Sequence, residues 1–108
     1  MTAITVGRLG GCDTIEILGH ANAGPFGKDL VCAGLSALAC AMVTSLQREE
    51  AEGSLETLST HIEPGFLSVA VRAKPARRAR VRGILDVCLT GFSMLAGTYP
   101  QNVRYTHT

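Results

Sequence analysis

Residues 2–18 read TAITVGRLGGCDTIEIL and hold the first pattern from which a fold can be predicted. The stretch Thr2–Leu9 is rich in β-branched and apolar residues, which favour a strand. Gly10 and Gly11 interrupt it, and residues 14–18 then alternate polar and apolar side chains with a period of two. Two such runs joined by glycines are typical of a β-hairpin, which we predict at the start of the chain.

A long helix is predicted after this hairpin and a glycine-rich segment. Asp29 can cap the helix, and apolar residues then recur at helical spacing as far as about Arg48. A second stripe on the same helix consists of the small residues Ala33, Ala37 and Ala41. Because this stripe is small rather than polar, we expect the helix to be buried on two sides, against its own sheet and against a neighbour such as a second subunit.

The rest of the chain predicts the same order of elements again. Pro64-Gly65 is a strong turn signal, and Pro75 suits the first turn of a second helix, which Gly97 ends. The expected elements are strands at 55–62 and 66–72, a helix at 76–96 and a last strand within 100–107. The order ββαββαβ predicts an α+β fold with two helices packed on one face of a mixed or antiparallel sheet.

The composition fits one small domain covering residues 1–108. The chain has 108 residues, 46% of them hydrophobic, and a formal net charge of +1, which excludes a disordered or collagen-like chain. No stretch approaches the ~20 apolar residues that span a bilayer, and the N-terminus lacks the pattern of a signal peptide. We therefore expect a cytoplasmic protein with no membrane partner.

The four cysteines contain no C-x-x-C pair, so we expect free thiols. Cys40 and Cys88 fall in apolar helical stretches and are predicted to be core residues, whereas Cys12 lies in a turn and is predicted to be exposed. No ligand pair has the spacing of a metal site, so we expect no metal and no other cofactor. The alternative is a metal held by His20, Cys32 and one of Cys12, Cys88 or His61.

His20 and Cys32 give the sharpest chemical signal in the sequence. His20 follows a predicted strand in a glycine-rich loop, and Cys32 stands twelve positions later, near the third residue of the predicted helix. The positive end of the helix dipole and unpaired N–H groups favour a nucleophilic thiolate there, and an adjacent imidazole can take the thiol proton. The same N–H groups could stabilise an oxyanion. On spacing alone, a structural cysteine and a solvated histidine are the commoner case.

The surrounding residues 19–38 read GHANAGPFGKDLVCAGLSAL. This segment resembles the signature of the ribosomal-processing cysteine proteases of bacteria, whose pattern is roughly G-H-A, a short gap, and G-x-D-[IL]-V-C-A-x-x-S-A-L. Every anchor position is present, and weaker similarity extends over essentially the full chain. The resemblance implies a catalytic dyad with His20 as general base and Cys32 as nucleophile.

The same signature includes Asp29 and Ser36, and two roles stay open for each. Asp29 either caps the helix or orients His20 or the substrate. Ser36 lies one turn beyond Cys32, where it either faces the same side or bonds back to the helix carbonyls. By resemblance, the loop at 21–28 helps to form the substrate cleft and closes over the substrate. Its candidate contact residues are Ala21, Gly24, Gly27 and Lys28.

The resemblance also implies a reaction and partners. Members of the family remove a short N-terminal extension from a large-subunit ribosomal protein precursor, cut after an aromatic residue, and assemble as homodimers. We therefore expect a thiol protease, a hydrolase of ribosome biogenesis, whose substrate is the ribosomal protein precursor. The expected partner is a second copy of the chain.

One feature departs from the family pattern. Six of the ten basic residues fall within eleven positions, namely Arg72, Lys74, Arg77, Arg78, Arg80 and Arg82. They either pair with the acidic segment at 49–63 as a solvated face, or contact ribosomal RNA or another acidic partner. The second interpretation supports an alternative function, a non-catalytic ribosome-associated or RNA-binding module that keeps its Cys-His pair as core.

Overall fold

The computed structural model describes residues 1–21, 23–25 and 29–108. Its strands are β1 (Thr2–Leu9), β2 (Cys12–Gly19), β3 (Leu55–Glu63), β4 (Phe66–Ala73) and β5 (Val103–His107). Its helices are α1 (Leu30–Ala51) and α2 (Arg78–Thr98), and a 3₁₀ turn at Pro75–Arg77 precedes α2. The predicted α+β class and the order ββαββαβ are confirmed.

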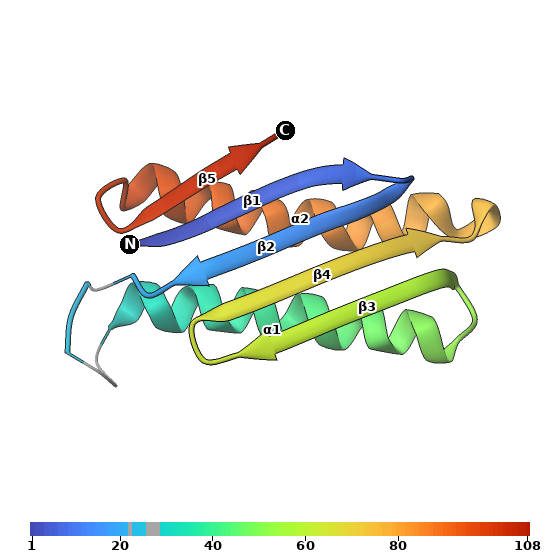
Figure 1. Cartoon of the computed structure of the whole chain (residues 1–108), viewed down its shortest axis with the longest axis horizontal. Helices are drawn as coiled ribbons and strands as arrows, with labels where there is room; N and C mark the ends of the chain where they lie inside the picture. The colour runs from blue at the N-terminus through green and yellow to red at the C-terminus, as the bar shows by residue number, and fades with distance from the viewer. Residues whose placement is uncertain (22, 26–28) are drawn as a thin grey trace.

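The strands form one mixed sheet in the order β3-β4-β2-β1-β5. Strands β1, β2, β4 and β3 pair antiparallel, and β5 pairs parallel to β1 at the other edge. Gly10 and Gly11 make the turn of the first hairpin in the left-handed region, with φ of 60° and 82°. Figure 1 shows both helices behind the same face of the sheet, with α1 behind β3 and β4 and α2 behind β1 and β5.

The hydrophobic core lies between this face of the sheet and the two helices. Alternate residues of the strands supply one side, because successive side chains of a strand point to opposite faces. Fully buried examples from the strands and helices are Ile4, Ile15, Val69, Met42, Leu85 and Phe92. Each such side chain contributes roughly 1.5–3 kcal/mol to folding.

Helix α1 has one buried face and one exposed small-residue face. Asp29 caps it as predicted, and the helix continues past Arg48 to Ala51. The buried face includes Val31, Leu35, Met42 and Leu46. The predicted second stripe, Ala33, Ala37 and Ala41, is exposed in the single chain. The described part of the chain therefore buries only one of the two sides that the sequence predicts to be covered.

Helix α2 differs from the prediction at both ends. Pro75 opens a 3₁₀ turn instead of the α-helix, and the N–H of Arg77 donates to the carbonyl of Lys74 at 2.8 Å. The α-helix begins only at Arg78 and passes through Gly97 to Thr98. Gly97 has no positive φ, so the helix continues until Tyr99.

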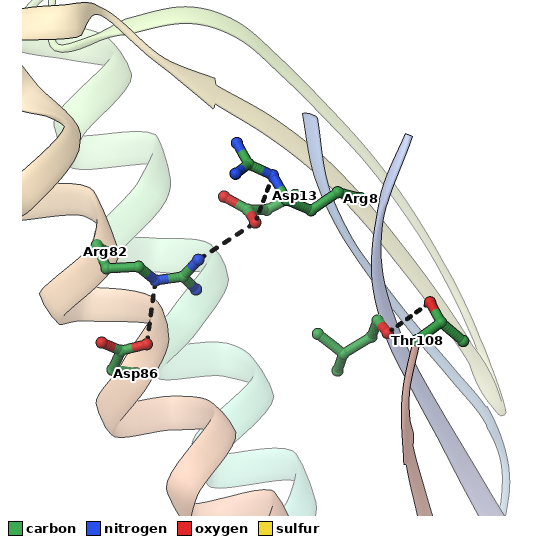
Figure 2. Close-up of polar contacts among 6 residues, drawn as sticks. Arg8, Asp13, Arg82, Asp86 and Thr108 are labelled. Atoms are coloured by element: carbon green, nitrogen blue, oxygen red, sulfur yellow. Dashed lines mark hydrogen bonds and ion pairs between the residues drawn. The ribbon is translucent and has the colours of Figure 1, made fainter. Parts of the chain in front are cut away.

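The basic cluster is partly neutralised within the chain. The Arg80 Nε donates to the buried Glu49 carboxylate at 2.7 Å, which links α2 to the end of α1, and Arg72 pairs with Glu56 at 3.2 Å. These two pairs confirm the expected contact with the acidic segment at 49–63. Arg82 instead pairs with two carboxylates outside that segment, as Figure 2 shows.

Two helical segments are more apolar than we predicted from the sequence. Leu30–Ala51 and Pro75–Thr98 are long and apolar enough to cross a membrane by length and composition alone. The expectation that no stretch approaches such a length was wrong, because small residues such as alanine add to the apolar total. Both segments pack a buried face against the sheet, and the core helices of a globular domain meet the same criterion.

Candidate active site

His20 follows the last residue of β2 and lies beside the turn between β3 and β4. The N–H of Gly19 donates to the carbonyl of Gly65 at 2.8 Å, which joins the end of β2 to this turn. The imidazole lies over Gly65, because a Cβ at that position would stand only 3.0 Å from the His20 Nε2. The absence of a side chain at Gly65 therefore leaves the space that the imidazole occupies.

Cys32 is the third residue of α1, as predicted, and its backbone is held by the helix cap. The Asp29 carboxylate accepts hydrogen bonds at 2.9 Å from the backbone N–H of Cys32 and from that of Ala23. The hydrogen bond from Cys32 is the main reason that the pKa of Asp29 is lowered. The capping role of Asp29 is confirmed, and the same carboxylate also holds the backbone of Ala23.

The Asp29 cap uses backbone N–H groups that were expected to stabilise an oxyanion. The N–H of Cys32 donates to the Asp29 side chain, and the N–H of Ala33 donates to the Asp29 carbonyl at 3.0 Å. Both backbone donors near the thiol are therefore engaged. The expectation that helix-start N–H groups stand free for an oxyanion does not hold for these two residues.

His20, Cys32 and Ser36 all line one open cleft of about 230 Å³ between the start of α1 and the turn between β3 and β4. Ser36 therefore faces the same side as Cys32, which is one of its two predicted positions. Apolar side chains form much of the remaining wall, and they include Leu35, Ala39, Ile62, Phe66 and Leu67. The cleft combines a half-buried thiol and an exposed imidazole with an apolar wall that suits a hydrophobic side chain.

The candidate loop residues have different positions. Ala21 is buried, and its carbonyl accepts a hydrogen bond from the Asn102 side chain at 3.0 Å, so it forms the fixed base of the loop. Gly24 is exposed. Gly27 and Lys28 lie outside the described residues. Asn102 was not predicted from the sequence, because no local pattern links residues that stand 81 positions apart.

For two of the other three cysteines, the burial predicted from the sequence was wrong. Cys40 is exposed and lines the same cleft as Cys32, so its assignment to the core was wrong. It lies between the buried Leu35 and Met42 in sequence but off the face that they share. Cys88 is buried as predicted, and burial raises its pKa. Cys12 is half-buried rather than exposed, with its Sγ 3.8 Å from the Thr57 hydroxyl oxygen.

The alternative metal site is not assembled by the fold. Cys12 begins the strand whose far end leads into His20, and none of the three possible third ligands, Cys12, Cys88 and His61, lines the cleft. Within residues 1–21, 23–25 and 29–108, no three His, Cys, Asp or Glu side chains come close enough to hold a metal ion.

A model of the cysteine protease Prp family matches residues 1–104 of the chain. The chain belongs to the Prp family of cysteine proteases. It is therefore an enzyme, a protease that uses a cysteine, and the family suggested by the sequence signature is confirmed. By sequence, no curated protein gives a significant match.

Solved structures share the fold of this Prp chain. The essential ribosomal processing protease Prp from S. aureus, with a covalently linked product peptide, is 21% identical, with a TM-score of 0.79 and 100% of both chains covered. The same protease with a substrate peptide is 20% identical, with a TM-score of 0.73 and again 100% of both chains covered. A protein from Streptococcus mutans is 24% identical, with a TM-score of 0.71 over 100% of this chain and 94% of the other.

Proposed function

We propose that the protein is a Cys-His endopeptidase in which Cys32 is the nucleophile and His20 the general base. The observation that carries this proposal is the cleft that both side chains line. Cys40 lines the cleft as well, but it stands eight residues further along α1, about 12 Å along the helix axis at 1.5 Å per residue. Among the four cysteines, Cys32 alone combines the cleft with the first turn of α1, at the positive end of the helix dipole.

The proposed reaction proceeds in two steps. The Cys32 Sγ forms a bond to the carbonyl carbon of the scissile peptide while His20 takes the thiol proton and passes it to the leaving amine. The products of this step are a thioester on Cys32 and the released C-terminal part of the substrate. A water molecule then gives a proton to His20 and attacks the thioester carbonyl carbon. The C–S bond breaks, His20 returns the proton to the Cys32 sulfur, and the N-terminal part of the substrate leaves as a carboxylic acid. No metal or other cofactor takes part in these steps.

We propose that the substrate is the precursor of a large-subunit ribosomal protein, from which the enzyme removes the N-terminal extension. The S. aureus relative is a ribosomal processing protease whose structures hold a substrate and a product peptide. The apolar wall formed by Leu35, Ala39 and Ile62 suits an aromatic residue at the cleavage point. Asp29 supports the site by binding the backbone N–H groups of both Cys32 and Ala23.

We also propose that the enzyme acts in the cytoplasm as a homodimer that uses the exposed small face of α1. Ala33, Ala37 and Ala41 allow a second helix to approach closely. The alternative function, a non-catalytic RNA-binding module, required the Cys-His pair to be core. His20 is exposed and Cys32 lines a cleft, and the family of the chain is enzymatic, so this alternative is not retained.

The test is cleavage of a synthetic peptide that spans the precursor extension and its junction, followed by mass spectrometry. The wild type should make one cut, and Cys32→Ala and His20→Ala should make none. Cys40→Ala is the matched control, because it removes a thiol from the same cleft, and it should cleave at nearly the wild-type rate. Loss of cleavage in Cys40→Ala with retention in Cys32→Ala would contradict the assignment.

A further inference from the structure

A second cleft lies at the opposite end of the sheet from Cys32. It encloses about 180 Å³ between the turn that joins β1 to β2, the end of β4 and the first turns of α2. In Figure 1 the β1–β2 turn and the start of α2 lie at one end of the molecule, and the start of α1 lies at the other. The protease chemistry therefore makes no use of this second cleft.

Four arginines from three elements line this cleft, and we call it the arginine cleft. They are Arg8 of β1, Arg72 of β4, and Arg78 and Arg82 of α2. Among the described residues that line the cleft, Asp13 is the one acidic residue. Its Oδ1 is shared, at 3.6 Å from the Arg8 Nε and 3.3 Å from the Arg82 Nη1 (Figure 2). One carboxylate charge thus faces four guanidinium charges.

Carboxylates outside the cleft offset little of this excess. Arg82 also pairs with Asp86 at 3.0 Å and Arg72 with Glu56 at 3.2 Å, but the side chains of Asp86 and Glu56 are 63% and 43% exposed. Such exposed pairs are screened by water and salt. Arg78 makes no ion pair with any residue in the described ranges. Because each guanidinium has five N–H donors, most of these donors are left to bind an anion.

The turn glycine Gly11 helps to shape the cleft. The Arg72 guanidinium lies against it, because a Cβ at Gly11 would stand 3.3 Å from the Arg72 Cζ. Arg72 Nη1 is also 3.5 Å from the carbonyl of Gly10. The close approach of this arginine to the turn therefore brings its charge toward Arg8 at the end of β1.

We propose that the arginine cleft binds the phosphodiester backbone of a nucleic acid. Planar guanidinium groups bind phosphate oxygens in pairs of hydrogen bonds, and several arginines in one concave site are the usual arrangement for this. None of the described residues that line the cleft is aromatic, so these residues offer no surface on which a base or nucleoside stacks. Between Ala73 and Arg78, which both line the cleft, the chain carries two more exposed cations, Lys74 and Arg77, which make no ion pair with described residues. This further positive charge suits a long polyanion rather than a small phosphate compound.

The test is fluorescence anisotropy of the full chain with a labelled RNA oligonucleotide and with DNA of the same sequence, over a range of salt. Arg78→Gln should weaken binding about tenfold, as expected for the loss of a charge-assisted hydrogen bond. It should also make the slope of log K against log salt shallower by about 0.7–0.9. Arg104→Gln is the matched control, because Arg104 is exposed on β5 outside the cleft, and it should bind nearly as the wild type does.

The substitution Asp13→Asn should change nucleic-acid binding in the direction opposite to Arg78→Gln. Removal of the one carboxylate from the lining should tighten binding, whereas a merely structural role of Asp13 would weaken it. The proposal is overturned if neither nucleic acid binds at low salt, or if Arg78→Gln and Arg104→Gln weaken binding equally. It is also overturned if inorganic phosphate binds but RNA and DNA do not. Because no arm uses the protease activity, failure here and failure of the proposed function are separate results.

Discussion

Replacing Gly65 by alanine separates two roles of this residue, its backbone conformation and its contact with His20. Gly65 has a φ of 76°, and a Cβ there would stand 3.0 Å from the His20 Nε2. Gly10 provides a matched control, because its φ is 60° and a Cβ there meets nothing within 4 Å. The two substitutions therefore share the backbone strain, and only Gly65→Ala displaces the imidazole.

The magnitudes of the two effects follow from this geometry. A left-handed conformation costs a residue with a side chain about 1–2 kcal/mol, so both variants should be destabilised to that extent. In a domain of this size, each kcal/mol lowers Tm by roughly 4–8 °C. Gly65→Ala must also move the imidazole by a few tenths of an ångström. Because a misplacement of about 1 Å can cost about 10²-fold in rate, we expect a loss of about tenfold in kcat/KM.

The assay combines thermal unfolding with steady-state cleavage of the precursor peptide at a temperature where both variants are folded. Gly65→Ala and Gly10→Ala should have similar Tm values, while only Gly65→Ala loses activity, mainly in kcat. If both variants keep the wild-type kcat/KM, or both lose it equally, then the contact between Gly65 and the imidazole has no role in catalysis.

Three further predictions concern other parts of the molecule. The hydrogen bond from Arg80 lowers the pKa of Glu49, so this pair stabilises the fold fully above the ordinary pKa of 4.5, and the stabilisation is lost as the pH falls through the lowered pKa. In urea unfolding between pH 6 and pH 3, the free energy of unfolding should therefore fall less in Glu49→Gln than in the wild type. Iodoacetamide on the folded protein should modify Cys32 and Cys40 but spare Cys88, which is buried with a raised pKa, and peptide mapping that finds Cys88 labelled first would contradict this. Ala37→Glu places a charge on the exposed small face of α1 and should convert a dimer to a monomer in light scattering, with a Tm that no longer depends on protein concentration. An unchanged mass would exclude this face as the dimer interface.

The elements that the sequence predicted well are those specified by local patterns. The first hairpin follows from alternation and the Gly10-Gly11 turn, and the start of α1 follows from the Asp29 cap. The start of α2 was misplaced, because Pro75 is compatible with both a 3₁₀ turn and the first turn of an α-helix. The pairing of β5 with β1 depends on contacts between distant segments, which no local pattern specifies.

The candidate site was predictable only in part for the same reason. The signature around His20 and Cys32 is contiguous in sequence and could be recognised. The contacts from Gly65 and Asn102 come from the turn between β3 and β4 and the segment before β5, and they become visible only after folding. Cys40 was misassigned because residues on every face of α1 are apolar or small, so the sequence does not distinguish the covered face from the exposed one.

The most direct test of the central claim is to trap the covalent intermediate. The wild-type enzyme is mixed with an ester of the peptide that ends at the cleavage point, quenched in acid within milliseconds to seconds, and examined by intact and peptide mass spectrometry. We expect an acyl adduct on Cys32 whose mass is that of the N-terminal fragment less one water, strongly reduced in His20→Ala. An adduct on Cys40, or an adduct on Cys32 that forms as fast without His20, would contradict the central claim.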